Sequence, residues 1–239
     1  MEVGGQPFPG RSDLWLDGGV VLRRHDSAKL DNVEWIHRFL ALLEFDAPKP
    51  VPYFDGASVA VVDGAVWSAL SYVDGDVVGW SSVPSMFDMG AFLATFHTAA
   101  AVVDMGGDTN QHVIHGDFTN HNVLASGNPP KPCGVIDFMN ACIAEPLFDI
   151  GCALWRSGRP SQDTQSFDAR RIVDYVDGYS SVHALSDDDR VSVVAYLRAR
   201  GVQIIAKQAA RGVVDDGPQR KLDWLRHHQH DLCSALLVR

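Results

Sequence analysis

The sequence predicts an α+β protein with a β-rich N-terminal part and a mainly helical C-terminal part. Residues 57–76 contain two strand-like segments on either side of Asp63-Gly64, a turn that is typical of a β-hairpin. From residue 147 onward, apolar residues recur at helical spacing. The pattern changes near residues 73–78, so we expect a small β-rich domain over 1–73 and a helical domain over 74–239.

The expected N-terminal elements are two strand pairs separated by one helix. Residues 14–24, "LWLDGGVVLRR", predict two short strands around a tight turn. Residues 29–45 have apolar side chains at helical spacing, and either Asp31 or Asn32 would be the N-cap. Prolines in the following segment end that helix, because proline lacks a backbone donor.

The expected C-terminal domain begins with an amphipathic helix over 85–103. Two short apolar strands with polar ends follow, within "HVIHGDFTNHNVLA" and "PCGVIDFMNACI". Helices are then predicted over 147–156, 166–181, 187–211 and 217–237.

Composition excludes several classes of protein. The chain has 239 residues and a net charge of −10, without the basic patch expected of a nucleic-acid binder. No apolar run is long enough for a membrane span, and the N-terminus does not resemble a signal peptide. Four scattered cysteines predict free thiols and a cytoplasmic location. The acidity favours solubility, or alternatively attraction of a cationic small substrate.

The stretch "VIHGDFTNHNVL" and the later "GVIDF" contain the residues with the clearest chemistry. Asp117 and Asn122 lie five residues apart before a predicted strand, and Asp137 ends another apolar strand. A carboxylate and an amide that converge can accept a hydroxyl proton or coordinate a hard cation. A buried aspartate is costly unless it is paired or bound to metal. Asn122 and Asp137 together therefore predict a Mg²⁺ site.

These motifs resemble the catalytic loop H-x-D-x-x-x-x-N and the metal-binding aspartate of protein-kinase-like proteins. The "HGD" and "VIDF" variants, followed by "EPLFDIG", resemble the aminoglycoside phosphotransferase and choline kinase branch. The resemblance implies a two-lobed protein-kinase-like fold with a shortened β-rich N-lobe and a mainly helical C-lobe.

The resemblance implies a role for each matching residue. Asp117 would be the catalytic base, and Asn122 and Asp137 would hold Mg²⁺ against the phosphates of ATP. His115 would steady the loop, and Asp149 would either orient the loop or cap a helix.

In the N-lobe, the family's phosphate-binding lysine would be replaced by Arg23. Glu34 would pair with Arg23, and the backbone of Ser71, Tyr72 and Val73 would bind adenine. The sequence departs from the family before Val20, where a glycine-containing segment, "VGGQPFPG", replaces the usual phosphate-covering loop. Gly4 and Gly5 could close over the nucleotide, or the loop could be nearly absent, which leaves ATP and GTP both open.

Simpler interpretations stay open for several of these residues. Arg23 and Glu34 could be surface charges, and Asp117 with Asn122 could form only a turn. His112, His115 and His121 with Asp117 could instead bind zinc. The acidic run at 187–189 would suit a cationic substrate or would simply begin a helix.

The resulting functional hypothesis is an ATP- and Mg²⁺-dependent O-phosphotransferase that acts on a small-molecule hydroxyl. The resemblance favours an aminoglycoside-like antibiotic as acceptor, and therefore a resistance kinase. The alternatives are a kinase of a metabolite such as choline, homoserine or a sugar, and a catalytically silent nucleotide-binding protein. We expect no nucleic-acid or membrane partner, and either a monomer or a homodimer.

Overall fold

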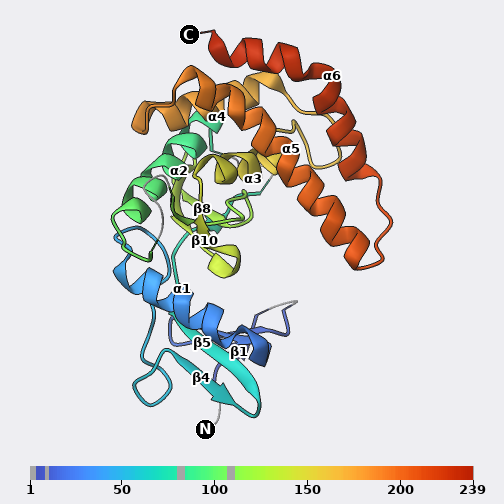
Figure 1. Ribbon diagram of the computed structural model, residues 1–239. Coiled ribbons are helices and arrows are strands. Elements are labelled where there is room, and N and C mark those ends of the chain that lie inside the picture. Colours follow the sequence, from blue (N-terminus) through green and yellow to red (C-terminus); the bar gives the residue numbers. More distant parts are fainter. Residues whose placement is uncertain (1–3, 9–10, 80–83, 107–110, 239) are drawn as a thin grey trace. The chain divides into compact units, whose positions relative to one another are not determined.

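The structure is a computed structural model that describes residues 4–8, 11–79, 84–106 and 111–238 (Figure 1). Its internal contacts divide the chain into two units. The first contains Met1–Asp74 and a returning segment, Gly134–Met139. The second contains Gly75–Cys133 and Asn140–Arg239. The returning segment is a feature that the division expected from the sequence does not include.

The first unit contains an antiparallel sheet of five strands in the order β1-β2-β3-β5-β4. Its strands are β1 (Gln6–Pro7), β2 (Leu14–Asp17), β3 (Val20–His25), β4 (Val59–Val62) and β5 (Ala65–Ser71). Leu22, Trp67 and Ala69 form the centre of an apolar cluster on this sheet. The two predicted hairpins are present because Gly18, Gly19 and Gly64 supply the positive φ that their turns need.

Helix α1 (Leu30–Leu42) belongs to the same unit as the sheet and is preceded by a short 3₁₀ turn, η1 (Ser27–Lys29). The predicted N-cap is wrong, because α1 begins one residue after Lys29 and the Asp26 side chain caps the 3₁₀ turn instead. Phe39 of α1 contacts Phe138, with ring centroids 6.2 Å apart. The backbone N–H of Val135 also donates to the Asp46 carbonyl, so the returning segment is bound within this unit.

The second unit is mainly helical and also contains short strands. Its helices are α2 (Met86–Ala101), α3 (Leu147–Ser157), α4 (Ala169–Val182), α5 (Asp187–Ala210) and α6 (Gly217–Leu237). The strands are β6 (Asp76–Val77), β7 (His112–Ile114), β8 (Val123–Ser126), β9 (Lys131–Val135, which continues into the returning segment) and β10 (Cys142–Ala144). A 3₁₀ turn, η2 (Phe138–Asn140), spans the end of the returning segment. β7 pairs with β10, and β6, β8 and β9 form a second small sheet in that order.

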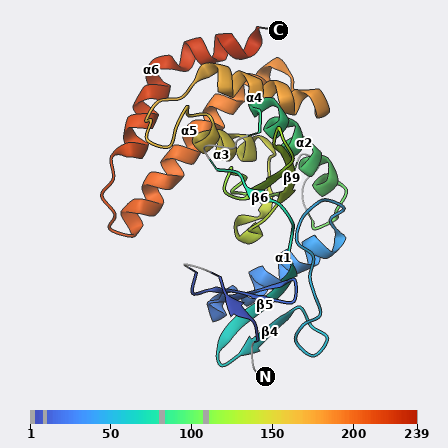
Figure 2. The ribbon, with the colours of Figure 1, turned by 180° about the vertical axis from the view of Figure 1, so that it is seen from behind.

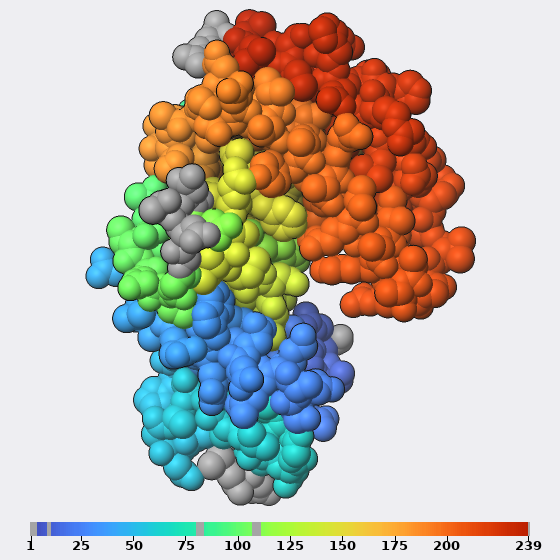
Figure 3. Space-filling model, viewed as in Figure 1, coloured from blue at the N-terminus to red at the C-terminus, as the bar shows by residue number. Residues whose placement is uncertain are grey.

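Close backbone contacts hold the helices of the second unit together. α2 packs on α4 and α3 packs on α5, and Figure 2 shows α5 and α6 running side by side. The same two helices, in orange and red, cover a continuous face of this unit in Figure 3. The acidic residues 187–189 form the first turn of α5, where Ser186 and Asp189 make a capping box, so they begin a helix.

No helix among the described residues is long and apolar enough to cross a membrane. All four cysteines are free thiols.

Candidate active site

The segment from His115 to Asn122 is a tightly folded loop between β7 and β8. Gly116 has a φ of +73°, and a Cβ at this position would lie 2.1 Å from the Asn140 carbonyl oxygen. Only glycine therefore fits there. After this residue the chain turns sharply, with the Thr119 N–H donating to the Asp117 carbonyl at 2.7 Å.

Asn122 fixes the far end of the loop. Its side-chain Nδ2 donates to the Asp117 carbonyl at 2.9 Å and to Asp117 Oδ2 at 3.3 Å. With the amide nitrogen turned toward Asp117, the Asn122 Oδ1 is the atom left to accept a hydrogen bond or to meet a cation. Asp117 itself keeps 29% of its side chain exposed, so its carboxylate can meet a substrate.

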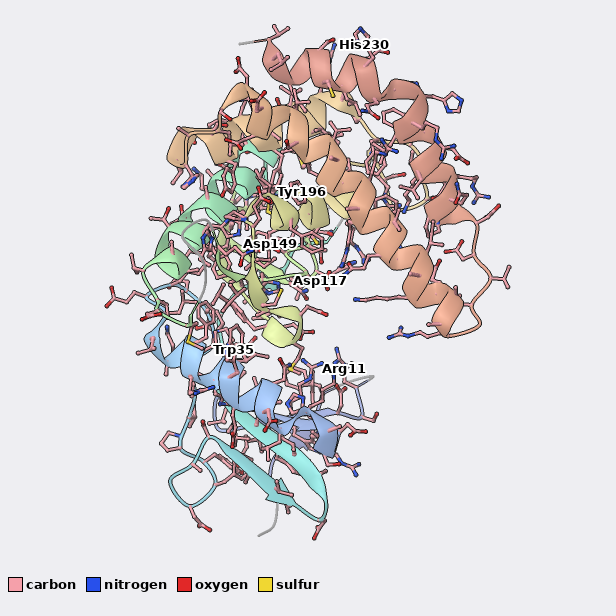
Figure 4. All side chains as sticks on the ribbon, in the orientation of Figure 1. Arg11, Trp35, Asp117, Asp149, Tyr196 and His230 are labelled. Carbon is pink, nitrogen blue, oxygen red and sulfur yellow. The ribbon has the colours of Figure 1, made fainter. Side chains whose placement is uncertain are left out.

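The side chain of Asp149 fixes the first residues of the loop. This carboxylate is fully buried at the first turn of α3 and accepts from the backbone N–H groups of His115 and Gly116, each at 2.7 Å. Its Oδ2 also lies 3.2 Å from His97 Nε2. Of the two roles expected for Asp149, the contacts are those of a residue that orients the loop, and the N-cap of α3 is Pro146. Figure 4 shows Asp117 and Asp149 side by side in the second unit.

His115 is buried inside the loop. Its ring packs edge-on against Phe118, with centroids 5.9 Å apart, and its Nδ1 accepts a 3.3 Å hydrogen bond from the Asp117 N–H. These contacts suit a residue that steadies the loop and leave it without access to a substrate.

Arg200 is a site residue that the sequence interpretation missed. It lies on α5, 83 residues beyond Asp117, and its guanidinium forms a 2.6 Å ion pair with Asp117 Oδ1. Arg200 and Asn122 therefore engage the two oxygens of one carboxylate and set its direction. A basic residue within a long helix gives no local signal of such a partner.

His97 was also missed, although the sequence offered a signal for it. It is the polar residue in the apolar stripe of α2, and it is 1% exposed. Its Nδ1 lies 2.9 Å from the Tyr179 hydroxyl, so His97 links α4 to the Asp149 carboxylate. A buried polar group needs partners, and a histidine within an apolar stripe predicts such a network.

Within the first unit, Arg23 of β3 forms a 2.7 Å ion pair with Asp137 of the returning segment. Arg23 Nε also lies 3.6 Å from Asp13. Asp137 has a φ of +63°, a backbone conformation that costs energy in a residue other than glycine. Two turn residues of the same unit, Asp55 and Asp63, also have positive φ values.

Glu34 is exposed on α1, and Arg23 is paired with Asp13 and Asp137 instead of with Glu34. The apolar stripe of α1 explains this difference, because Val33, Ile36 and Leu40 face the core and leave Glu34 outside it.

In the expected adenine-binding segment, two of the three backbone N–H groups donate hydrogen bonds within the protein. The Ser71 N–H donates to the Lys49 carbonyl, and the Tyr72 N–H donates to the Gly19 carbonyl, both at 2.8 Å. Of the three residues named from the sequence, Val73 has the backbone N–H that these hydrogen bonds leave available.

The glycine-containing N-terminal segment lies partly outside the described residues, which omit 1–3 and 9–10. Gly4 and Gly5 precede β1, a short edge strand that the sequence did not predict because two residues carry almost no pattern. Pro7 is tolerated in β1 because β1 is at the edge of the sheet.

The zinc alternative gains no support. Among the described residues, no group of three or more His, Cys, Asp or Glu side chains could hold a metal ion. His121 binds the Arg156 guanidinium, and His112 packs against His97 with ring centroids 5.2 Å apart.

Comparison with solved structures identifies the class of fold. The microcompartment-associated aminopropanol kinase matches with a TM-score of 0.67 and 15% identity, over 98% of this chain and 93% of that one. Amicoumacin kinase in complex with AMP-PNP, Ca²⁺ and its ligand matches with a TM-score of 0.68 and 13% identity, over 95% and 89%. The GDP complex of aminoglycoside 2′-phosphotransferase-IIIa matches with a TM-score of 0.61 and 15% identity, over 95% and 92%. The chain therefore has a kinase-like α+β fold, as predicted.

The family resemblance is confirmed over the central part of the chain. Residues 99–185 match the model of the phosphotransferase enzyme family, APH. This range contains the loop from His115 to Asn122, together with Asp137 and Asp149. No curated protein sequence matches the chain.

Proposed function

We propose that this protein transfers the γ-phosphoryl group of ATP or GTP to a hydroxyl group of a small molecule. The observation that carries the proposal is the Asp117 carboxylate, which is partly exposed on a loop fixed by Asp149, Asn122 and Arg200. That loop lies within the segment that matches the phosphotransferase family. The solved relatives that bind AMP-PNP or GDP support a nucleoside triphosphate as the donor.

In this proposal Asp117 accepts the proton of the attacking hydroxyl and aims its oxygen at phosphorus. Phosphoryl transfer needs little covalent chemistry from the protein, so positioning and charge supply most of the rate. The hydrogen bonds from Asn122 and Arg200 fix the direction of the Asp117 carboxylate, which reduces the reorganisation needed before transfer.

Asn122 and Asp137 are the residues that would hold Mg²⁺. Along the chain, Asn122 directly precedes β8 and Asp137 comes two residues after the end of β9. An amide oxygen and a carboxylate are ligands that Mg²⁺ accepts, and the bound ion would neutralise phosphate charge. Arg23, paired with Asp137, would add a second positive charge for the phosphates.

The expected acceptors divide by charge. Aminoglycosides carry several ammonium groups, and the family resemblance favours them as substrates and favours a resistance role. The metabolite alternative ranges from the cation choline through zwitterionic homoserine to neutral sugars. A catalytically silent nucleotide-binding protein would turn over none of them.

The test is nucleotide consumption with a panel of hydroxyl acceptors, with phosphorylated products identified by mass spectrometry. We expect Asp117→Asn to lower kcat by about 10²- to 10⁴-fold, which is the usual contribution of a general base. The matched control is Asp231→Asn, on the exposed surface of α6. Full activity of Asp117→Asn would refute the role of Asp117, and a wild-type protein that binds nucleotide without turnover would support the silent alternative.

A further inference from the structure

Four basic side chains gather on the side of the second unit that contains Asp117. They are Arg156 of α3, Arg159 just after α3, Arg200 of α5 and Lys221 of α6, here called the basic array. The array is notable in a chain with a net charge of −10. It begins at Asp117 itself, through the ion pair with Arg200.

Direct contacts and mutual electrostatic effects join the members of the array. Arg156 donates a hydrogen bond to Nε2 of His121, a residue of the catalytic loop. Lys221 Nζ lies over the Trp155 ring, 5.1 Å from its centroid, and Trp155 immediately precedes Arg156. Lys221 also experiences the charges of both Arg159 and Arg156. The positive charge is therefore continuous from the catalytic loop to α6.

Most side chains of the array are buried. Arg159 is 7% exposed, Lys221 is 8% exposed, and the Arg200 side chain is 12% exposed. The Nε of Arg156 is buried and has no hydrogen-bond partner among the described residues. Burial of cations is costly unless anions neutralise them, so this arrangement needs an explanation.

The described part of the chain places few anions close to these side chains. Asp117 pairs with Arg200, while the described residues place no carboxylate within 4.0 Å of Arg156 or Lys221. Asp117 also attracts Arg156. Asp163 attracts Arg159 and Asp215 attracts Lys221, but both of these acids are exposed, where water and salt weaken their effect.

Two members of the array have neutral contacts where an ion pair could form. Lys221 lies on the aromatic ring of Trp155, and Arg156 donates to the His121 ring. Burial lowers the pKa of Arg156, Arg159 and Lys221, and it lowers that of Lys221 to about 8, with repulsion from the neighbouring arginines adding to the effect. A bound anion would reverse that penalty.

We propose that the basic array binds an anionic group, a carboxylate or a phosphate, of the acceptor whose hydroxyl is phosphorylated beside Asp117. The inference rests on the proposed phosphotransfer and names its substrate class. It favours an acidic hydroxyl metabolite over an aminoglycoside, because like charge would repel the ammonium groups of an aminoglycoside from this array. Arg200 would keep Asp117 oriented, and Arg156 and Lys221 would contact the anion.

The first test compares acceptors that share a carbon skeleton and differ only in charge. Glycerol, 2,3-dihydroxypropanoate and 3-amino-1,2-propanediol form one such set, and sorbitol and gluconate form a longer neutral and anionic pair. Glycerol 3-phosphate separates phosphate from carboxylate recognition. We expect kcat/KM to be about 10- to 100-fold higher for the anionic member of a set than for the neutral one. Equal rates, or preference for the amine, would overturn the proposal.

The second test changes the array. Lys221→Met keeps the apolar stem on Trp155 and removes the charge, so the ratio of kcat/KM for the anionic over the neutral acceptor should fall about 10- to 100-fold. Lys221→Arg should restore that ratio. The matched control is Lys131→Met, at an exposed lysine of β9, which should keep the wild-type ratio. An unchanged ratio in Lys221→Met would refute the role of Lys221 in anion binding.

A binding measurement separates this inference from the proposed function. If no acceptor is phosphorylated, the phosphotransferase proposal fails, and titration calorimetry with 2,3-dihydroxypropanoate and glycerol still tests the array. Binding of the anion alone, weakened in Lys221→Met, would support it, and binding of neither would overturn it. If Lys221→Met does not fold, Arg156→Gln serves instead, because Arg156 is less buried.

Discussion

Asp149 is a single residue on which the position of the candidate catalytic loop depends. Its two oxygens accept the consecutive backbone N–H groups of His115 and Gly116, and His97 provides a third contact. The sequence showed this aspartate as part of a motif but left its role open. The role follows from burial, because a carboxylate with no access to water must be satisfied by protein donors.

At this scale we predict that Asp149→Asn destabilises the protein by about 2–3 kcal/mol. An amide is neutral and presents one acceptor oxygen and one NH₂ group, so both backbone donors of the loop lose a charged partner and one of them loses its acceptor. Urea unfolding measures the change. The control is Asp168→Asn at the N-cap of α4, where asparagine caps as well as aspartate. Equal stability of the Asp149 variant and the wild type would contradict this account.

At the scale of elements, the contact between α2 and α4 depends on two glycines. A Cβ on Gly90 would lie 1.9 Å from the Tyr175 carbonyl oxygen, and one on Gly178 would lie 2.0 Å from that of Phe87. The two helix backbones therefore touch directly. This contact also brings Tyr179 of α4 to His97 of α2, and through it to Asp149. Helix packing in this unit thus supports the site.

We predict that Gly90→Ala lowers the free energy of unfolding by about 1–3 kcal/mol through overpacking. Helix propensity alone predicts the opposite sign, since alanine is favoured over glycine by about 1 kcal/mol in a helix. Thermal and urea unfolding decide between them. Gly79→Ala, where a Cβ meets nothing within 4 Å, is the control that should leave stability almost unchanged. A stabilised Gly90 variant would disprove the close contact.

Most elements followed from the sequence, because hairpin turns and helical periodicity are local properties. The helices from residue 147 onward begin and end within a few residues of their predicted bounds. The elements whose bounds the sequence did not predict also differ for local reasons. β1 is too short to show a pattern, and the start of α1 depends on the choice between neighbouring polar residues, of which Asp26 caps the turn before the helix.

At the scale of the whole molecule, one buried and two partly buried histidines couple stability to pH in both units. Burial lowers the pKa of His25 and His37 in the first unit, and of His112 in the second, each to about 4. Between pH 6.5 and 4 the unfolded chain therefore binds more protons than the folded one. The free energy of unfolding falls as the pH decreases through this range, and this loss is absent above pH 6.5.

We predict that His37→Gln weakens this pH dependence while a hydrogen bond to Ser58 is kept. The buried His37 contributes on the order of 3 kcal/mol to the acid-induced loss of stability. Urea unfolding at intervals from pH 4 to pH 7 measures the slope for wild type and variant. His230→Gln, on exposed α6 (Figure 4), is the control. A slope that His37→Gln leaves unchanged would contradict the prediction.

The sequence by itself determined the order of most elements, because local spacing and turn chemistry carry that information. The kinase-like fold class came from the resemblance of the motifs that contain Asp117, Asn122 and Asp137 to a known family. Only the tertiary structure decided that Arg200 contacts Asp117, that Arg23 pairs with Asp137, and that basic residues from three helical regions gather near one loop. Such contacts join residues up to 114 positions apart, and no local pattern specifies which distant side chain will neutralise a given charge.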